Sequence, residues 1–367
     1  MENKQIGILT FHDADNYGAV LQAYALQHFI DKNISSNVEI LDYRKNTKAA
    51  KGTSIFKGAT HNPIKNVILN ILQYLQRKEL RAIHEKFESF RSDYLKLSQR
   101  TYETEEDLSQ CENKDYYITG SDQVFNPRLS DYRIYYLDFV KGRGKKVAYA
   151  PSFGISSFND DITNQIKPLL VNFDAISCRE ESGAKYITQI LGTDVPVVLD
   201  PVFLLSKEEW REVAIAPKEK NYILVYCLSK GQSSKIARLA KRIAKQENLD
   251  VITIGSTGVF SMKGRECKVV GPREFVGYFN KAGFVLTDSF HGTSFSLLFG
   301  KRHLSYIVNK EKGTRIETIM KAFGKGQEII YEIDKYIYNS DAIKPASIIP
   351  NEKLKVSKEY LHSYLKG

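Results

Sequence analysis

Apolar segments that end in small, polar corners alternate with helical segments along most of this 367-residue chain. Residues 6–11 read as a buried strand, residues 18–27 as a helix and residues 38–43 as the next strand. A strand–helix–strand start of this kind indicates a parallel sheet of the α/β class. Further strands are expected at residues 115–119, 146–150, 175–178, 195–199, 222–227, 251–254, 285–287 and 303–308.

The strand and helix series starts afresh near residue 206, so the chain reads as two doubly wound halves. We predict two Rossmann-like domains, over residues 1–203 and 204–345, which face each other across a cleft between their strand ends. Residues 346–367 contain a terminal helix that can pack back on the first domain. The chain is long enough for two domains of ordinary size.

The composition favours a folded protein with anionic partners. A hydrophobic content of 42% supports a real core, and the net charge is +10. No nucleic-acid-binding signature accompanies this charge, so we expect small anions and a membrane surface as partners rather than nucleic acid. Residues 64–97 predict an amphipathic helix, broken near residues 77–78, with a basic face that contacts either a membrane or only solvent.

The cysteines and the N-terminal residues indicate the cellular compartment of the protein. The four cysteines are widely spaced, without a CxxC motif or a Cys/His cluster, so we expect reduced thiols and no structural zinc site. No signal peptide precedes the first strand, and no apolar run has the length to span a bilayer. We therefore expect a cytoplasmic protein, which can still lie at the inner face of the membrane.

One histidine lies at the junction of a predicted strand and a predicted helix, a position typical of ligand-binding residues. Residues 285–293 read Val-Leu-Thr-Asp-Ser-Phe-His-Gly-Thr and lead into an apolar helix. Such a corner lies at the carboxyl end of a strand, where ligands bind in open α/β sheets, and the helix start suits a phosphate or carboxylate. The imidazole of His291 can move a proton there, or it can simply cap the helix.

Five motifs occur in order along the chain. They are Asn-Tyr-Gly-Ala-Val-Leu-Gln-Ala-Tyr-Ala-Leu at residues 16–26, Gly-Ser-Asp-Gln-Val-Phe-Asn-Pro at 120–127, Cys-Arg-Glu-Glu-Ser at 178–182, Leu-Asp-Pro at 199–201 and Thr-Asp-Ser-Phe-His-Gly-Thr at 287–293. This series resembles the polysaccharide pyruvyl transferase family over about residues 5–325.

The resemblance implies a GT-B-like fold and a defined reaction. A pyruvate (carboxyethylidene) group would pass from phosphoenolpyruvate, a co-substrate, to two hydroxyls of a sugar, which forms a ketal and releases phosphate. The acceptor would be a sugar or lipid-linked oligosaccharide, a precursor of a surface polysaccharide such as a capsule or exopolysaccharide. The first domain would hold the acceptor and part of the donor site, and the second domain the donor side with His291.

One position departs from the family pattern. Characterised members commonly carry an arginine two residues before the histidine, in Ser-Arg-Leu-His, where this chain has Ser289. If that arginine grips the donor anion, another cation must replace it here, and Arg315 and Lys301 are the nearest candidates in the sequence.

The reaction needs an acid for the methylene carbon and cations for the donor's two anionic groups. His291 fits the acid by residue type and position. Arg179 follows a strand and opens a helix, so it fits an anion clamp; its alternative is a surface salt bridge with Glu180 or Glu181. Asp122 can orient or deprotonate an acceptor hydroxyl, or it can serve as a turn or helix cap.

The remaining candidates are loop residues at strand ends. Donor contacts are expected from Ser289, Gly292 and Thr293 at the corner and from Gly255 and Ser256 in a glycine-rich turn, which can also be a plain tight turn. Acceptor contacts are expected from Asn16, Tyr17, Gly18 and Gln123, with a helix cap as the alternative for Asn16.

We expect neither a cofactor nor a metal ion, because arginine, lysine and helix N-termini carry the charge stabilisation. Two other functions stay open at this point. The same cleft would serve a glycosyltransferase that uses a nucleotide sugar, and a non-catalytic carbohydrate-binding subunit could retain the fold.

Overall fold

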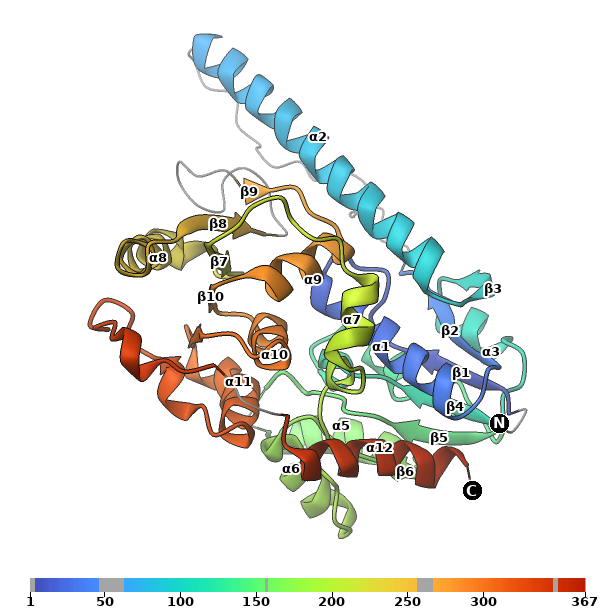
Figure 1. Ribbon diagram of the computed structural model, residues 1–367. Coiled ribbons are helices and arrows are strands. Elements are labelled where there is room, and N and C mark those ends of the chain that lie inside the picture. Colours follow the sequence, from blue (N-terminus) through green and yellow to red (C-terminus); the bar gives the residue numbers. More distant parts are fainter. Residues whose placement is uncertain (1–3, 46–62, 156–157, 256–266, 346–348, 367) are drawn as a thin grey trace.

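The computed structural model describes residues 4–45, 63–155, 158–255, 267–345 and 349–366, which form two parallel six-stranded sheets (Figure 1). The first sheet has the order β3-β2-β1-β4-β5-β6 and the second β12-β11-β10-β7-β8-β9. The first six strands are β1 (Ile6–Leu9), β2 (Val38–Tyr43), β3 (Leu97–Tyr102), β4 (Tyr116–Thr119), β5 (Lys145–Ala148) and β6 (Ala175–Ile176). The second six are β7 (Tyr222–Tyr226), β8 (Asp250–Ile254), β9 (Cys267–Lys268), β10 (Phe284–Thr287), β11 (His303–Tyr306) and β12 (Ile329–Ile330).

The strand order reverses once in each sheet, between β1 and β4 and between β7 and β10. These four strands are buried along their whole length, because helices cover both faces of each sheet. Ligands of doubly wound folds bind outside the carboxyl ends of the strands at such reversals. The prediction of two doubly wound sheets is confirmed, and the topology directs attention to the loops after these four strands.

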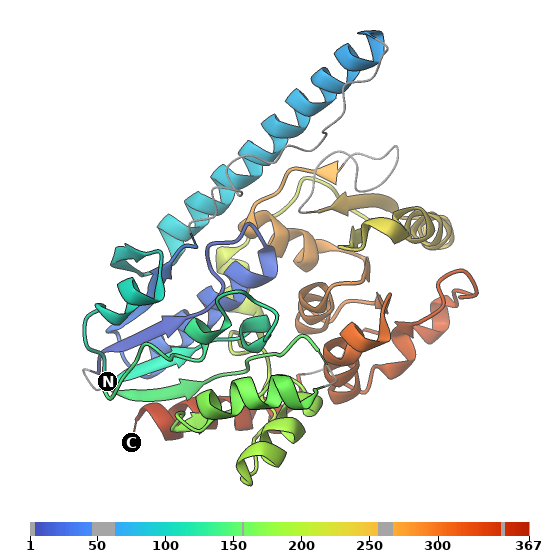
Figure 2. The ribbon, with the colours of Figure 1, turned by 180° about the vertical axis from the view of Figure 1, so that it is seen from behind.

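The longer helices connect the strands and cover the sheets. They are α1 (Tyr17–Asn33), α2 (Pro63–Tyr94), α5 (Asp160–Leu170), α6 (Glu181–Leu191), α8 (Ser233–Glu247), α9 (Pro272–Lys281), α10 (Phe290–Leu298), α11 (Lys310–Ala322) and α12 (Asn351–Leu365). Shorter ones are α3 (Glu105–Ser109), α4 (Tyr132–Tyr135) and α7 (Lys207–Val213). The predicted break near residues 77–78 is absent: α2 is one continuous helix, and its N-terminal end extends away from both sheets (Figures 1 and 2).

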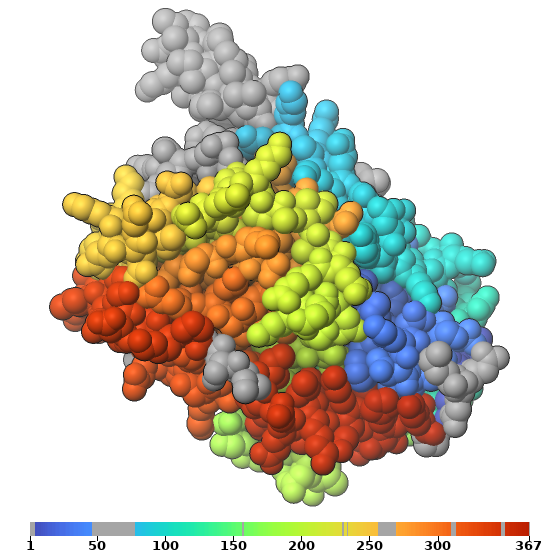
Figure 3. All heavy atoms as spheres, in the orientation of Figure 1, coloured from blue at the N-terminus to red at the C-terminus, as the bar shows by residue number. Residues whose placement is uncertain are grey.

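The two halves are joined by a continuous apolar core. The ring of Tyr17 at the start of α1 stacks on Phe275 of α9, with ring centroids 4.5 Å apart, and its hydroxyl donates to the backbone oxygen of Val270 at 2.9 Å. Lys86 of α2 pairs with Glu274 of α9. In the space-filling view the chain around α7 lies along the seam between the two halves (Figure 3). The loops after β1 and β10 are thereby brought close together.

The last helix lies against the first sheet although it follows the second in sequence (Figure 1). Ser357 Oγ accepts a hydrogen bond from the backbone N–H of Leu199 at 2.8 Å, and Tyr360 donates to the backbone oxygen of Ala148 at 3.0 Å. Leu361 and Leu365 are fully buried. Helix α12 thus completes the core of the first half beside the segment that leads to Asp200.

The prediction of a strand at residues 195–199 is wrong. Val197 makes one isolated bridge to Cys178, and the segment joins no ladder. Pro196 explains the difference, because proline has no N–H with which to continue a ladder. Among the described residues, none of the helices combines the length and the apolar character that crossing a bilayer requires.

Candidate active site

Polar side chains from both halves meet near the carboxyl ends of strands β4, β6 and β10. Arg179 follows β6, Asp122 follows β4, and Asp200 stands just before the short 3₁₀ helix η2 (Pro201–Phe203). His291 belongs to the first turn of α10, after β10, and Arg315 comes from α11. The sequence-predicted His291, Arg179, Asp122 and Arg315 are therefore brought together in one place.

Arg179 is the centre of this group, and its side chain is only 2% exposed. Its Nη1 donates to Asp200 Oδ2 at 2.7 Å and to Ser121 Oγ at 3.2 Å, while Nη2 lies 3.5 Å from Asp122 Oδ1. The guanidinium also lies over the ring of Phe290, 4.2 Å from its centroid. The alternative of a surface salt bridge is therefore wrong, since the charge is held in the interior.

Asp200 anchors both Arg179 and His291 without being exposed. Its Oδ1 accepts from the backbone N–H of Val202 at 3.1 Å, and its Oδ2 accepts from Ser121 Oγ at 2.9 Å as well as from Arg179. Burial pushes the pKa of Asp200 upward, but His291 and Arg179 outweigh burial and hold the pKa well below its usual range. Asp200 therefore stays ionised.

His291 does not cap its helix, because Ser289 does so by accepting from the backbone N–H of Gly292 at 3.4 Å. The imidazole lies between Asp200, 3.6 Å from Nε2, and Gly18 at the start of α1. A Cβ added to Gly18 would stand 2.0 Å from Nδ1, so the ring fills the space that a side chain there would need. Gly18 of the first half therefore positions the histidine of the second.

Four buried polar atoms at this place have no hydrogen-bond partner: Arg179 Nε and Nη2, Glu180 Oε2 and His291 Nε2. Buried polar atoms are almost always paired, and leaving one unpaired costs about 1–3 kcal/mol. Four such atoms in one cluster indicate a site that a small polar ligand completes. Two are donors on a cation, so an anion suits them.

Arg315 is the cation from the second half that joins this cluster. Burial lowers the pKa of Arg315, and the neighbouring charge of Arg179 lowers it further, against the opposing carboxylates of Asp122 and Glu180. Gln123, with its amide oxygen turned toward Arg315, would accept from both terminal nitrogens at 3.2 and 3.1 Å. Two guanidinium groups from different halves, the buried Arg179 and the half-buried Arg315, thus lie in one polar cluster.

Lys301 is not part of the site. It follows the C-terminal end of α10, whereas His291 stands at the N-terminal end of the same helix. Burial lowers the pKa of Lys301 to about 8, and the charges acting on it are those of Arg211, Lys281 and Lys207. Of the two predicted substitutes for the family arginine, only Arg315 reaches the cluster.

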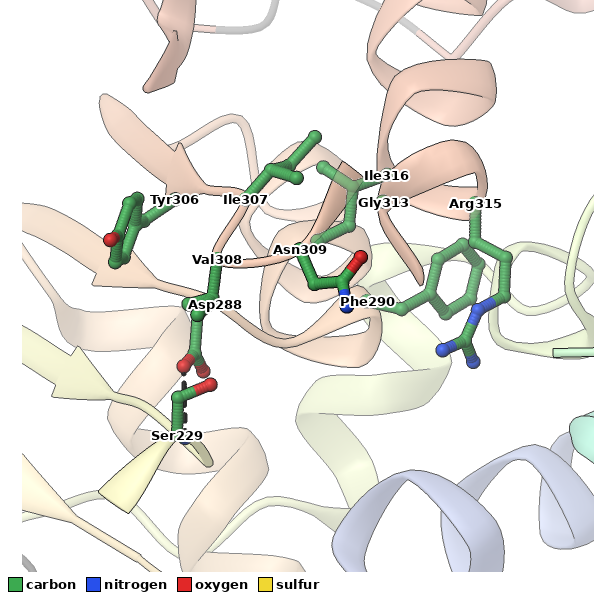
Figure 4. A pocket seen from close by; sticks show the side chains of 10 residues that line it. All are labelled: Ser229, Asp288, Phe290, Tyr306, Ile307, Val308, Asn309, Gly313, Arg315 and Ile316. Carbon is green, nitrogen blue, oxygen red and sulfur yellow. Dashed lines mark hydrogen bonds between the residues drawn. The ribbon is translucent and has the colours of Figure 1, made fainter. Parts of the chain in front are cut away.

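A pocket of about 270 Å³ opens beside Arg315 in the second half. Figure 4 shows Phe290 and Arg315 at one end of the pocket and Asp288 and Ser229 at the other. Asn309 and Tyr306 also line it, together with aliphatic side chains, and Tyr306 lies at the end with Asp288. The Asp288 carboxylate is occupied, because it accepts from the backbone N–H groups of Leu228 at 2.6 Å and Ser229 at 2.9 Å.

The predicted acceptor residues have different surroundings. Asn16 caps α1, since its side chain accepts from the N–H groups of Gly18 at 3.0 Å and Ala19 at 3.4 Å. Tyr17 is fully buried in the packing between the halves. Gly18 lies against His291, and Gln123 lies beside Arg315.

The small donor-side residues shape the corner. A Cβ on Gly292 would stand 2.2 Å from Thr287 Oγ1, and Thr293 Oγ1 bonds to the backbone oxygen of Ser289 at 3.0 Å. Gly255 is buried directly after β8, and Ser256 lies outside the described residues. These contacts fit α10 closely onto the strand ends.

Asp122 combines both of its predicted roles. Its side chain accepts from the backbone N–H of Gln123 at 2.9 Å and caps the 3₁₀ turn η1 (Gln123–Phe125), while the same Oδ1 faces Arg179. Its φ of 75° lies in the left-handed region, which a non-glycine residue adopts only at a cost. Strained backbone of this kind is concentrated at functional sites.

Asp200, Glu180 and Ser121 were not among the predicted site residues. Each stands inside a quoted motif, next to or near a residue that was selected. Their position at the ends of predicted strands could have pointed to them. That position alone, however, does not distinguish a buried ion-pair partner from an ordinary turn residue. Within the described residues, no group of three or more His, Cys, Asp and Glu side chains is arranged to hold a metal ion.

Comparison with solved structures supports the fold. The UDP-GlcNAc 2-epimerase of Methanocaldococcus jannaschii, in complex with UDP-GlcNAc and UDP, matches with a TM-score of 0.50 and 11% identity over 100% of both chains. UGT89C1 of Arabidopsis thaliana matches with a TM-score of 0.46 and 10% identity, over 100% of this chain and 94% of that one. The predicted GT-B-like arrangement of two parallel sheets is confirmed.

Comparison by sequence identifies the family. No curated protein matches the chain at a significant level of similarity. The family model for polysaccharide pyruvyl transferase matches residues 16–310, a span that contains Asp122, Arg179, Asp200 and His291. The chain belongs to the polysaccharide pyruvyl transferase family.

Proposed function

We propose that the protein transfers a pyruvate group from phosphoenolpyruvate to two hydroxyls of a sugar in a surface-polysaccharide precursor. The products are a cyclic ketal and phosphate. The observation that carries this proposal is the pair of guanidinium groups, the buried Arg179 and the half-buried Arg315, beside His291 Nε2, which lacks a hydrogen-bond partner.

The donor matches the charge of the cluster. Phosphoenolpyruvate carries a phosphate and a carboxylate, and guanidinium groups bind both through paired N–H donors. Arg179 Nε and Nη2 lack hydrogen-bond partners, and Arg315 brings a second cation from the other half. The first turn of α10 adds N–H groups that favour an anion. Arg315 thereby takes the role of the arginine that family members carry at the position of Ser289.

His291 then has the role of general acid. It protonates the methylene carbon of the donor, which makes the neighbouring carbon an oxocarbenium-like electrophile. Asp200 on one side and Gly18 on the other fix the orientation of the ring. A sugar hydroxyl, oriented by Asp122, adds to the electrophilic carbon; phosphate leaves, and the second hydroxyl closes the ketal.

The pocket beside Arg315 suits the sugar side of the reaction. Its lining of Tyr306, Phe290 and Asn309 offers a ring face and an amide to a hydroxyl-rich group. We propose a sugar or lipid-linked oligosaccharide as acceptor. The net charge of +10 is consistent with work at the inner face of the membrane, because the anionic lipids of that face attract basic proteins.

A glycosyltransferase that uses a nucleotide sugar is the second candidate. One observation favours it: the pocket lies at strand ends of the second half, in a fold shared with an epimerase solved with UDP-GlcNAc. The charge of the lining disfavours it. Arg315 is the cation that lines the described pocket, Asp288 is an anion at its other end, and a nucleoside diphosphate needs more positive charge.

The test compares donors. The protein is incubated with phosphoenolpyruvate or a panel of UDP-sugars, together with methyl glycosides of common hexoses that have free 4- and 6-hydroxyls. Phosphate and UDP release are measured, and the product is examined by mass spectrometry. Phosphate release with a ketal product supports the proposal. UDP release without consumption of phosphoenolpyruvate would establish the second candidate instead.

Two variants separate the assigned roles. His291→Ala should reduce kcat by about 10²–10⁴-fold with donor affinity retained, because acid catalysis is lost. Arg179→Ala should weaken phosphoenolpyruvate binding by about tenfold or more, since a charge-assisted contact is worth about 1.5–3 kcal/mol. The exposed Arg238 provides the matched control, Arg238→Ala. Wild-type turnover in correctly folded His291→Ala would refute the acid role.

A further inference from the structure

Ketal formation moves two protons, and His291 is assigned to one of them. The two sugar hydroxyls together lose two protons. One proton ends in the methyl group of the ketal, delivered by His291. The other must reach the phosphate, because the carbon–oxygen bond to phosphate breaks more easily when the leaving oxygen is protonated. A second group that moves a proton from the acceptor to the donor phosphate would assist the departure of phosphate.

Glu180 is placed and held for such a role. It directly follows Arg179, and only 2% of its surface is exposed. Its Oε1 accepts from Ser152 Oγ at 2.6 Å, and Ser152 Oγ in turn accepts from the backbone N–H of Gly154 at 3.1 Å. Its Oε2 lies 4.0 Å from Arg179 Nε, and both of these atoms lack a hydrogen-bond partner.

This geometry differs from that of the two neighbouring carboxylates. Asp200 uses both oxygens, which accept from Val202, Ser121 and Arg179. Asp122 Oδ1 is engaged by the backbone of Gln123. Glu180 instead has one oxygen anchored and the other directed to unpaired donors of the anion clamp. One oxygen atom of a ligand could contact both Glu180 Oε2 and Arg179 Nε, since each hydrogen bond spans about 2.8 Å.

We propose that Glu180 is the second proton carrier of the reaction, a catalytic residue whose Oε2 takes the proton of the first sugar hydroxyl and passes it to the departing phosphate. This inference rests on the proposed function. The acceptor O–H bond breaks as the bond between its oxygen and the donor carbon forms. The bond from that carbon to the phosphate oxygen then breaks, and Glu180 supplies the proton to phosphate.

Both carriers return to their starting states in this cycle. His291 gives a proton to the methylene carbon and regains one from the second hydroxyl as the ring closes. Glu180 gains a proton from the first hydroxyl and loses it to phosphate. Nothing is oxidised or reduced, and no further reactant is needed.

The surroundings of Glu180 make it suitable for exchanging a proton. Burial raises the pKa of Glu180, and Arg179, the Ser152 hydroxyl and Arg315 offset only part of that effect. The Cys178 thiol is a further titratable neighbour, and Asp122 and Asp200 act on Arg179 from its other nitrogens. Because Glu180 must be ionised to accept the first proton, kcat should fall as the pH falls through its pKa.

The experiment measures phosphate release against pH for the wild-type protein, Glu180→Gln and the matched control Glu181→Gln, whose residue is exposed. Phosphoenolpyruvate and the same methyl glycosides are the substrates, and calorimetry gives donor affinity. Glu180→Gln should lower kcat by about 10²–10⁴-fold, bind phosphoenolpyruvate at least as tightly as wild type, and lose the acid limb of the profile. Glu181→Gln should match wild type in all three measurements.

The outcomes distinguish this inference from the proposed function. A wild-type protein that does not consume phosphoenolpyruvate removes the basis of both. An active wild type with equal kcat in the two variants overturns the role of Glu180 alone, as does a slower Glu180→Gln that keeps the acid limb. If Glu180→Gln does not fold, Glu180→Asp decides: a reduced kcat with a displaced acid limb supports the role, and an unchanged profile refutes it.

Discussion

At the scale of single residues, the candidate site depends on the space that small residues leave as well as on its charged side chains. Gly18 is the clearest case, because the imidazole of His291 occupies the position of its missing side chain. The pair is separated by most of the chain, and yet the ring packs directly against the glycine. The glycine of the first motif is therefore a spatial requirement of the histidine in the last.

Gly18→Ala should reduce kcat by about 100-fold, because the added carbon displaces the imidazole by an ångström or more. Alanine is a better helix former than glycine, so helix propensity alone would predict that the substitution stabilises α1. Steady-state kinetics and circular dichroism check this together. Gly326→Ala is the matched control, since a Cβ there meets nothing within 4 Å. An active Gly18→Ala would show that the ring can move freely.

At the scale of elements, one buried carboxylate in β2 is bonded to the loop after β1, to the residue after β2 and to strand β3. Asp42 accepts from His12 Nε2 at 2.9 Å, from Arg44 Nε at 2.8 Å and from Thr101 Oγ1 at 2.9 Å. Burial raises the pKa of Asp42, but these bonds outweigh burial and lower it from 3.8 to about 2. His12, which has no recognisable context in the sequence, thus has a structural partner.

Asp42→Asn should destabilise the protein by about 2 kcal/mol at pH 7, the linkage value of a depressed pKa of this size. A lowered pKa stabilises the fold above the ordinary pKa and ceases to do so as the pH falls through the folded value. The stability difference between wild type and variant should therefore be roughly halved by pH 3. Urea unfolding across pH 3–7 measures it, with the exposed Asp194→Asn as control. A pH-independent difference would contradict the assignment.

Helix α12 supports the site without contributing a side chain to it. Ser357 Oγ satisfies the buried N–H of Leu199, the residue before Asp200. Ser357→Ala should cost about 1–3 kcal/mol of unfolding free energy, because that N–H loses its partner in the interior. Ser363→Ala on the exposed face of the same helix should cost almost nothing. Equal thermal midpoints for the two variants would show that Leu199 finds another acceptor.

At the scale of the whole molecule, the cations of the candidate site come from both halves. Arg179 belongs to the first half and Arg315 to the second, and the N-terminus of α10 lies beside them. Guanidinium groups and helix N-termini can neutralise a phosphate without a metal ion. We therefore expect phosphate release to stay within about twofold after treatment with EDTA. Activity that EDTA abolishes and a divalent ion restores would refute this.

Much of the fold could be read from local pattern. The central strands are continuous apolar runs, and the corners after them contain the small and polar residues that strand ends require. Caps were readable for the same reason, since Asn16 bonds within three residues of itself. These features depend on neighbours in the sequence, and so the sequence by itself determined the α/β class, the strand ends and the position of His291 on its helix.

The tertiary structure alone decided which strand ends meet. Arg315 and Lys301 were equal candidates in the sequence, but α10 has nine residues and is about 13 Å long, which places Lys301 on its far side. Whether Arg179 was a surface ion pair or a buried clamp depended on Asp200 and Phe290, which come from distant segments. The physical reason is that burial and electrostatic pairing follow from distance in space, which sequence neighbours do not specify.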